Sequence, residues 1–368
     1  MIPVAEPLLD ERARAYAQEA VASGWISSDG RFLTEFEQRW AEYCGVAHGI
    51  AVCNGTAALE VAVAALDLEP GSEIIMPSFT IISCALAVVQ AGCVPVLVDC
   101  DPDTWCLDME QAAARITPRT KAIMPVHMYG HPADMDAVMA LAERHGLAVI
   151  EDAAQAHGAT YRGRRAGGIG TMGCFSFYAN KIITTGEGGM VVTNDDRLAN
   201  RLRSARNLCF RRERRFFHTE LGHNYRMTNV QAAIGLAQVE AIDGHLACKR
   251  RMAALYTERL QGLAGLSLPV ERPEVTNVFW MYGVVLDDAV PFDAVELARL
   301  LRERGVDTRP FFLGMHEQPV FHERGLFLGE RYPVSERLAR RGLYLPSGLP
   351  LTEAQIETVS TAVREVMA

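Results

Sequence analysis

The sequence predicts an α/β protein in which a large domain with a mostly parallel sheet is followed by a smaller α+β domain. Between residues 49 and 152, short apolar runs alternate with segments of helical length, a pattern typical of a parallel sheet covered by helices. A chain of 368 residues, 49% of them hydrophobic, is also long enough for two domains. We expect residues 1–245 to form the large domain, including an N-terminal arm, and residues 246–368 to form the small domain.

The composition excludes several classes of protein. A formal net charge of -9 argues against a general nucleic-acid binder, which carries a basic stripe that neutralises phosphates. Nine cysteines without a CxxC pair indicate buried reduced thiols, and neither a disulfide framework nor a metal site is expected. The N-terminus shows no basic segment followed by an apolar one, and no run of 18 apolar residues occurs. We therefore expect a cytoplasmic protein without membrane contact.

The chain begins with a short extended arm and two predicted helices. The first is expected over about 10–23, and the second, with Phe36 and Trp40 at helical spacing, over about 33–44. Between them lies a segment rich in turn-forming residues that contains Trp25. Packing in the core or an interface is the simplest interpretation of both tryptophans.

The alternating pattern then predicts a series of strands and helices. The expected strands are 49–54, 73–78, 94–99, 121–127 and 147–152, and the expected helices are 56–68, 82–92 and 135–146. Ligands of such sheets lie beyond the carboxyl ends of the strands. The residues that follow each strand are therefore the candidate site residues.

Three of these strand ends carry residues of uncertain role. Gly55, Thr56 and Ala57 open a helix, where free backbone N–H groups and the helix dipole can bind an anion, although an ordinary capped turn has the same composition. Phe79 could present its ring to a flat cofactor or pack in the core. His127 is interpreted as structural because it lacks the spacing of a metal-ligand set.

Asp152 is a more specific signal because it ends an apolar strand. A carboxylate there is costly to bury unless a positive or hydrogen-bonding group meets it. The protonated ring nitrogen of pyridoxal 5'-phosphate (PLP) is such a group, and the aspartate would keep that nitrogen protonated. Gln155 could reach the edge of the ring if the chain turns into a helix. Alternatively, Asp152 is a helix N-cap.

Lys181 lies between an aromatic, strand-like stretch, 175–180, and a glycine-rich turn, 186–189. Apolar neighbours would lower its pKa by desolvation, as a lysine that forms a Schiff base requires. Ser176 is placed to donate its hydroxyl to a phosphate. The turn leads into a strand over 190–193 and predicts a hairpin. Lys181 together with Asp152 indicates a PLP site.

The second half of the chain continues with helices and fewer strands. Helices are expected over 196–206, 228–261, 292–305 and 352–366, and strands over 278–287 and 306–310. The long helix should carry the chain from the large domain into the small one. A small domain of this kind can close over a substrate.

Three long motifs, EDAAQAHGA, FSFYANKIITTGEGGMVVTND and GHNYRMTNVQAAIGLAQ, closely resemble the sugar aminotransferases of the DegT/DnrJ/EryC1/StrS family. The resemblance extends from WISSDGRF to LYLPSG, nearly the whole chain. It implies the PLP-dependent aspartate-aminotransferase fold, fold type I. Within the family it is strongest to enzymes that use L-glutamate to aminate the C4 ketone of GDP-4-keto-6-deoxy-D-mannose, which implies a place in O-antigen and lipopolysaccharide biosynthesis.

The resemblance also implies roles for individual residues. Lys181 would hold the cofactor covalently and carry the proton between cofactor and substrate. Asp152 would pair with the ring nitrogen and Gln155 would approach the phenolic oxygen. The phosphate would be held by Ser176 and by the amides of Gly55, Thr56 and Ala57. Asn224 would reach the phosphate from a partner subunit, so the active protein would be a homodimer with shared sites.

The residues that contact the substrate and the cofactor ring are less clearly marked. Trp25, Arg309 and His316 match the part of the family sequence near the sugar. Many family members stack an aromatic ring on the cofactor where this chain has Ile81, so either Phe79 substitutes for that ring or the stacking comes from elsewhere. The arginines and aromatics of 206–218 form either a solvated loop or a site for the nucleotide diphosphate.

Other functions remain open on sequence grounds. The substrate could be a UDP- or dTDP-linked keto sugar or a keto-cyclitol. A regulatory protein that binds PLP or a sugar nucleotide without catalysis is a further alternative, which Lys181 and Asp152 argue against. A dinucleotide-binding dehydrogenase is disfavoured because no GxGxxG follows the first strand. Family members that are dehydratases carry histidine in place of the lysine.

Overall fold

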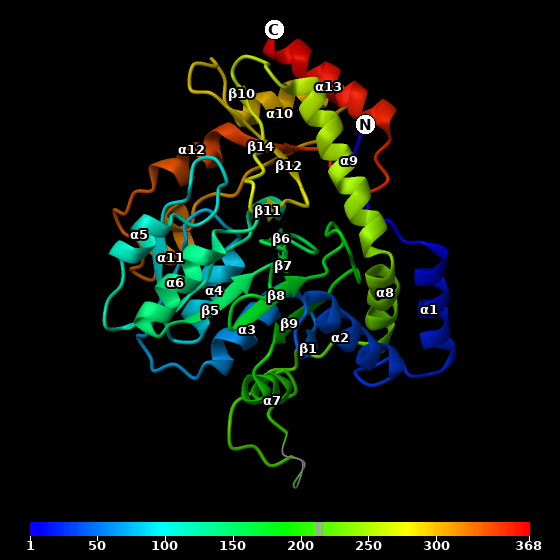
Figure 1. Cartoon of the computed structure of the whole chain (residues 1–368), viewed down its shortest axis with the longest axis vertical. Helices are drawn as coiled ribbons and strands as arrows, with labels where there is room; N and C mark the ends of the chain where they lie inside the picture. The colour runs from blue at the N-terminus through cyan, green and yellow to red at the C-terminus, as the bar shows by residue number, and fades with distance from the viewer. Residues whose placement is uncertain (211–213, 215) are drawn as a thin grey trace.

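The structure is a computed structural model that describes residues 1–210, 214 and 216–368. Helix α1 (Glu11–Ala22) begins where Asp10 accepts a hydrogen bond from the Ala13 amide at 2.8 Å. Helix α2 (Arg31–Cys44) buries Phe36 and Trp40. Both helices lie where the sequence predicts them, and α1 packs against α8 (Asn229–Glu240) at the outside of the molecule (Figure 1).

A seven-stranded sheet forms the centre of the larger part, in the order β1-β9-β8-β5-β4-β2-β3. Its strands are β1 (His48–Val52), β2 (Glu73–Pro77), β3 (Val94–Val98), β4 (Thr120–Ile123), β5 (Ala148–Asp152), β8 (Met172–Ser176) and β9 (Gly189–Thr193). Strand β9 runs antiparallel to β1 and β8, and the other pairs are parallel. The predicted mostly parallel sheet is confirmed, as is the hairpin that leads into β9.

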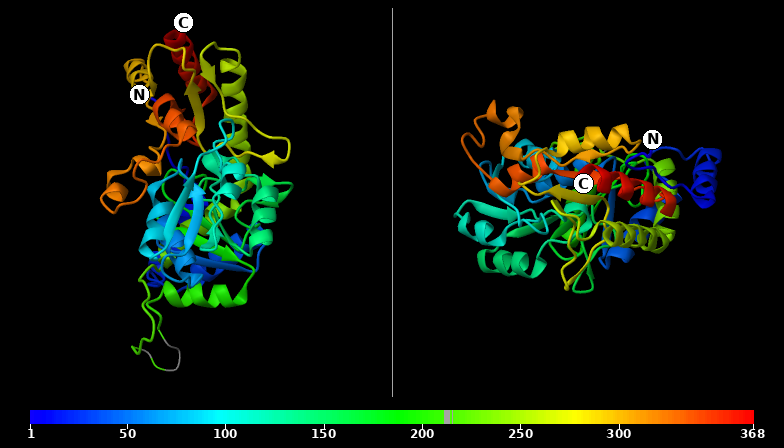
Figure 2. Two further views of the ribbon diagram at one scale, coloured as in Figure 1. Left: turned by 90° about the vertical axis from the view of Figure 1, so that its left-hand side faces the viewer. Right: turned by 90° about the horizontal axis from the view of Figure 1, so that it is seen from above.

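Helices connect the strands and pack against the sheet (Figures 1 and 2). They are α3 (Gly55–Ala65), α4 (Ile82–Gln90), α5 (Met109–Ala114), α6 (Met135–His145) and α7 (Asp196–Ala205). Their buried faces join the strands in one hydrophobic cluster. The thiols are free, and seven of the nine cysteines are buried, in agreement with the reduced core cysteines that the sequence indicates.

The C-terminal part contains a second, four-stranded sheet. Its order is β10 (Leu266–Ser267), β12 (Tyr282–Leu286), β14 (Gly342–Leu345) and β13 (Arg309–Pro310), all antiparallel. Helices α9 (Ile242–Leu260), α10 (Ala294–Glu303) and α13 (Glu353–Met367) pack with it around a separate hydrophobic cluster. This is the α+β arrangement expected of the small domain.

The boundary between the two parts of the chain is less sharp than the sequence predicts. The predicted helix over 228–261 is two helices, α8 and α9, which meet at Ala241. Helix α9 crosses the proposed boundary at 245, so this division stays a prediction. The N-terminal arm reaches the C-terminal part, where Ile2 forms an isolated parallel bridge with Val306, before β13.

Several short elements of the C-terminal part pack into the larger cluster. They are η2 (Met315–Glu317), α11 (Pro319–His322) and α12 (Pro333–Arg341). A three-stranded sheet has the strand order β11 (Val275–Thr276), β6 (Thr160–Tyr161) and β7 (Arg164–Arg165). A short 3-10 helix, η1 (Met128–Gly130), follows β4. None of the helices in the described part of the chain has the length and apolar character needed to cross a bilayer.

Candidate active site

The candidate site lies at the carboxyl ends of three strands that run in the same direction. Strand β5 ends at Asp152, β8 ends at Ser176, and β1 is followed by Gly55 at the start of α3. Strands β5 and β8 are direct neighbours, with Asp152 opposite Cys174. The parallel sheet therefore brings together residues that are more than a hundred positions apart in the chain.

The proposed phosphate region is built by a close approach of α3 to β8. A Cβ atom added at Gly55 would lie 2.6 Å from the Ser176 Cβ, so only glycine fits here. Asn54 caps the helix by accepting a hydrogen bond from the Ala57 amide at 2.8 Å. Within the described chain, the amides of Gly55 and Thr56 find no protein acceptor. These two donors and the Ser176 hydroxyl suit an anion.

The Asp152 side chain is 1% exposed, and few hydrogen-bond donors reach its carboxylate. One oxygen accepts from the Cys84 thiol at 3.0 Å and the other from the Ala154 amide at 3.0 Å. Burial and then the charge of Asp152 raise the pKa of the Cys84 thiol well above its ordinary value, so the thiol remains a donor. No cationic side chain of the described residues forms an ion pair with Asp152. A buried carboxylate in this state fits a cationic ligand, such as a protonated ring nitrogen.

The adjacent carboxylate, Glu151, has a different environment. It accepts hydrogen bonds from His127 Nε2 at 2.9 Å and from the amides of Gly167, Ile169 and Gly170. Burial alone would raise the pKa of Glu151, but the contact with His127 and these amides outweighs it and lowers the pKa. Both carboxylate oxygens of Glu151 therefore accept hydrogen bonds from groups inside the fold. His127 has the structural role predicted for it.

Lys181 follows β8 at the same edge of the sheet and is partly buried. Burial lowers its pKa to about 7, and the negative charge of Asp152 opposes this change. Its Nζ lies 3.6 Å from the centroid of the Trp280 ring. An amine with a pKa near 7 is substantially uncharged at neutral pH, which is the nucleophilic form.

Two further cofactor candidates are buried beside the site. Gln155 accepts the Tyr129 amide at its Oε1, at 2.8 Å, and its Nε2 has no acceptor among the residues that the structure describes. Phe79 has no exposed surface and packs against Phe311, with ring centroids 5.7 Å apart. The core-packing alternative accounts for this position. The stacking of Phe79 on a cofactor stays a prediction, and Ile81 is the exposed side chain nearby in sequence.

The candidates for substrate and partner contacts are more dispersed. Trp25 is 60% exposed and Asn224 is also exposed, and neither touches Lys181 or Asp152 within one chain. Arg309 is exposed and pairs with Asp307 at 2.9 Å. Four residues of the loop 206–218, Arg211, Arg212, Glu213 and Arg215, lie outside the described residues.

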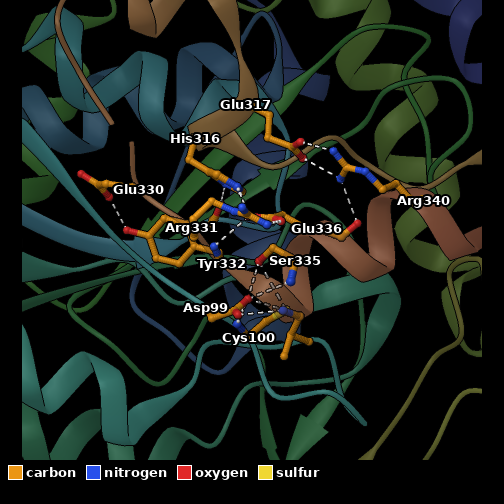
Figure 3. A network of polar contacts seen from close by, with 12 residues as sticks. Asp99, Cys100, His316, Glu317, Glu330, Arg331, Tyr332, Ser335, Glu336 and Arg340 are labelled. Atoms are coloured by element: carbon orange, nitrogen blue, oxygen red, sulfur yellow. Dashed lines mark hydrogen bonds and ion pairs between the residues drawn. The ribbon is translucent and has the colours of Figure 1, made fainter. Parts of the chain in front are cut away.

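His316 is buried in a network that joins the two parts of the molecule (Figure 3). Its Nδ1 lies 2.7 Å from the Ser78 hydroxyl, and its Nε2 lies 3.2 Å from Glu336. Glu336 is also bound by Arg331 at 2.6 Å, and this contact with Arg331 is the main cause that lowers the pKa of Glu336 to about 2. These contacts are structural, and a role of His316 toward a substrate stays a prediction.

Sequence reasoning missed two residues that touch the site. Cys84 lies on α4, in an apolar helix whose pattern gives no sign that its thiol reaches Asp152. Trp280 lies in the segment 278–287 that the sequence predicts as a strand, and nothing in that segment shows contact with a lysine 99 positions earlier (280 - 181 = 99). Both contacts depend on the fold rather than on local sequence.

Comparisons with known proteins agree with this geometry. The model of the DegT/DnrJ/EryC1/StrS aminotransferase family matches residues 7–364. GDP-perosamine synthase of Caulobacter vibrioides is 46% identical over 370 residues, covering 100% of this chain and 98% of that protein. The dTDP-3-amino-3,4,6-trideoxy-alpha-D-glucose transaminase of Streptomyces venezuelae is 39% identical, covering 98% of this chain and 95% of that protein.

Solved structures show the same relationship. The crystal structure of S. venezuelae DesV in complex with a ketimine intermediate has a TM-score of 0.90 and 38% identity, with 99% of each chain covered. The family match over nearly the full chain and the shared architecture confirm both the predicted fold type I and the predicted enzyme class. The chain therefore belongs to the DegT/DnrJ/EryC1/StrS aminotransferase family.

Proposed function

We propose that the protein is a cytoplasmic, PLP-dependent homodimer that transfers the amino group of L-glutamate to the C4 ketone of GDP-4-keto-6-deoxy-D-mannose and forms GDP-perosamine. The observation that carries the cofactor assignment is the buried Asp152, which forms no ion pair with a described residue, at the sheet edge where Lys181 has a pKa of about 7. The 46% identity to a full-length GDP-perosamine synthase supports the substrate.

The residues present fit PLP at each of its functional groups. Asp152 would hold the ring nitrogen and the free Nε2 of Gln155 would donate to the phenolic oxygen. The amides of Gly55 and Thr56 would bind the phosphate together with Ser176. The Ala57 amide is already used by Asn54, so its contribution would be to the helix dipole.

Bound PLP supplies a ring that withdraws electrons and thereby stabilises the negative charge left when a C–H proton departs. The protein contributes the groups that move this proton and keep it in place. Lys181 Nζ can accept the proton in its uncharged form and return it from its ammonium form, because its pKa lies near neutral pH. The negative Asp152 keeps the ring nitrogen positive.

Replacement of the lysine tests the assignment directly. Lys181→Ala should lack the visible absorption band of bound PLP and should lose turnover, because the amine that would join the cofactor is removed. Lys249→Met is a matched control, since Lys249 is also a buried lysine whose pKa burial lowers to about 7, but its Nζ is held by backbone carbonyl groups. The control should keep the visible band. Turnover by Lys181→Ala would contradict the mechanism.

The identity of the nucleotide is the part of the substrate assignment for which a relative supports an alternative. The S. venezuelae relative, which is 39% identical, is named for a dTDP-linked sugar. A UDP- or dTDP-linked keto sugar is therefore the second candidate. Glutamate-dependent turnover should be compared with GDP-, UDP- and dTDP-linked 4-keto-6-deoxy sugars at matched concentrations. A preference for the GDP sugar is expected. Binding without turnover of any keto sugar would instead favour a regulatory binder.

A further inference from the structure

The indole ring of Trp280 is the group that directly faces the Lys181 amine. Nζ lies 3.6 Å from the ring centroid, within the range in which a cation interacts with the face of an aromatic ring. Trp280 is 5% exposed and comes from the segment just before β12, so it belongs to the C-terminal part of the chain. The site lysine and this ring therefore come from opposite sides of the boundary between the two sheets.

Trp280 is held on three sides. Its Nε1 donates to the carbonyl oxygen of Asn180, the residue before Lys181, at 2.7 Å. Its own carbonyl oxygen accepts from Lys249 Nζ at 2.9 Å. Its ring lies nearly parallel to that of Tyr129, with centroids 6.1 Å apart and an angle of 29°. The position of the ring is thus set by the protein and not by Lys181.

The charged groups around Lys181 are few. Asp152 at the end of β5 favours its ammonium form, and His157, in the turn after β5, is a second titratable neighbour. Glu6 of the N-terminal arm and Lys249 of α9 line the same small cavity. No carboxylate hydrogen-bonds to Nζ in the described chain, and the ring face of Trp280, 3.6 Å from Nζ at its centroid, is an electron-rich contact of the amine.

We propose that Trp280 is a positioning residue for the aminotransferase reaction: its ring face holds the Lys181 amine inside the site whenever that amine is not joined to the cofactor. The inference rests on the proposed function, because the lysine must alternate there between a bound and a free state. An attraction to the ring face also favours the ammonium form, while burial favours the neutral amine. Trp280 therefore adjusts both the place and the protonation of the amine.

The test uses the full-length protein freed of PLP. The pKa of Lys181 is measured from the pH dependence of its reductive methylation, read by mass spectrometry on the peptide that contains it. Trp280→Leu and Trp280→Met keep the surroundings apolar but remove the aromatic face. They should shift the protonation equilibrium of Lys181 roughly threefold to thirtyfold toward the neutral amine, which lowers the pKa. Trp280→Phe keeps an aromatic face and should shift it less.

Trp105→Leu is the matched control. Trp105 is also 5% exposed and also contacts Tyr129, with ring centroids 5.9 Å apart, but it does not touch Lys181. Its replacement should leave the pKa of Lys181 unchanged. An unchanged or raised pKa in Trp280→Leu and Trp280→Met, or an equal fall in Trp105→Leu, would overturn the proposal. Since the labelling needs no cofactor, its result is separate from the PLP-binding test of Lys181→Ala.

Discussion

A methyl group at Gly55 would lie 2.6 Å from the Ser176 Cβ, closer than such atoms approach in proteins. We therefore expect Gly55→Ala to push the start of α3 away from β8 and to weaken PLP binding by roughly fivefold or more, since overpacking costs about 1–3 kcal/mol and about 1.4 kcal/mol is a factor of ten. Fluorescence or absorbance titration of the cofactor-free protein with PLP measures this. Gly244→Ala is the control, because nothing lies within 4 Å of a Cβ at that position. Equal affinity in both variants would show that the close approach is not needed.

His157 links the site to the acid stability of the fold. It is fully buried between Trp40 and Phe175, and burial, followed by the charge of Lys181, lowers its pKa to about 3. In the unfolded chain its pKa is about 6.5. Below that pH the unfolded state binds a proton that the folded state does not bind. The free energy of unfolding therefore falls by up to about 1.4 kcal/mol per pH unit until the pH nears 3.

Replacement by phenylalanine should remove this loss. We expect the free energy of unfolding of His157→Phe to increase relative to that of the original protein as the pH falls from 7 to 5, because the variant has no imidazole to protonate in the unfolded chain. Urea denaturation at pH 7, 6 and 5 measures the difference. A constant difference across this range would mean that His157 can be protonated in the folded protein.

At the scale of elements, the cap of α12 comes from a distant strand. Asp99, directly after β3, accepts from the amides of Val334 and Ser335 at 2.8 Å each and from the Ser335 hydroxyl at 2.7 Å (Figure 3). The residue that precedes the helix, Tyr332, makes no side-chain cap of its own. Asp99 therefore caps α12 and also ties it to the central sheet.

Loss of the Asp99 carboxylate should lower the free energy of unfolding more than loss of a local helix cap. Asp99→Ala is expected to lower the free energy of unfolding by about 2–3 kcal/mol, because three donors, two of them in buried hydrogen bonds, lose a charged acceptor. Asp108→Ala, which removes the exposed cap of α5 from its amides, should cost about 1 kcal/mol. Urea denaturation of the two variants compares them. A similar cost for both would argue that α12 is not anchored through Asp99.

The same helix shows where sequence reasoning reaches its limit. Alternating apolar runs predict β1 to β5 and the helices α3, α4 and α6, because each of these elements buries a face that its own sequence encodes. Asp152 and Lys181 could be identified because they end or follow such strands. Helix α12 was not predicted, since its cap lies more than 230 positions away. The contact of Trp280 with Lys181 depends in the same way on how two sheets are packed together.

At the scale of the whole molecule, one chain leaves parts of the proposed site at its surface. Asn224, expected to reach the phosphate of a second copy, is exposed. Trp25 and Ile26, in the segment that also carries the family resemblance, are 60% and 53% exposed. Exposed apolar residues of this size next to each other are typical of an interface. The proposed homodimer would cover them and complete each site with a residue of the other chain.

Mixing two inactive variants tests whether the sites are shared. Lys181→Ala lacks the site lysine and Asn224→Asp places a negative charge where the phosphate would lie, so each homodimer should be inactive. In a mixed dimer, one of the two sites pairs the intact Lys181 of one chain with the intact Asn224 of the other. Random reassortment of equal amounts should therefore restore about a quarter of the original activity, because half of the dimers are mixed and each has one complete site. Mixing Lys181→Ala with Asp152→Ala is the control: both residues belong to the same site of one chain, so every site would lack one of them and no activity should return. No recovery with Asn224→Asp would mean that Asn224 serves the site of its own chain. Recovery in the control would mean that Lys181 and Asp152 act in sites of different chains.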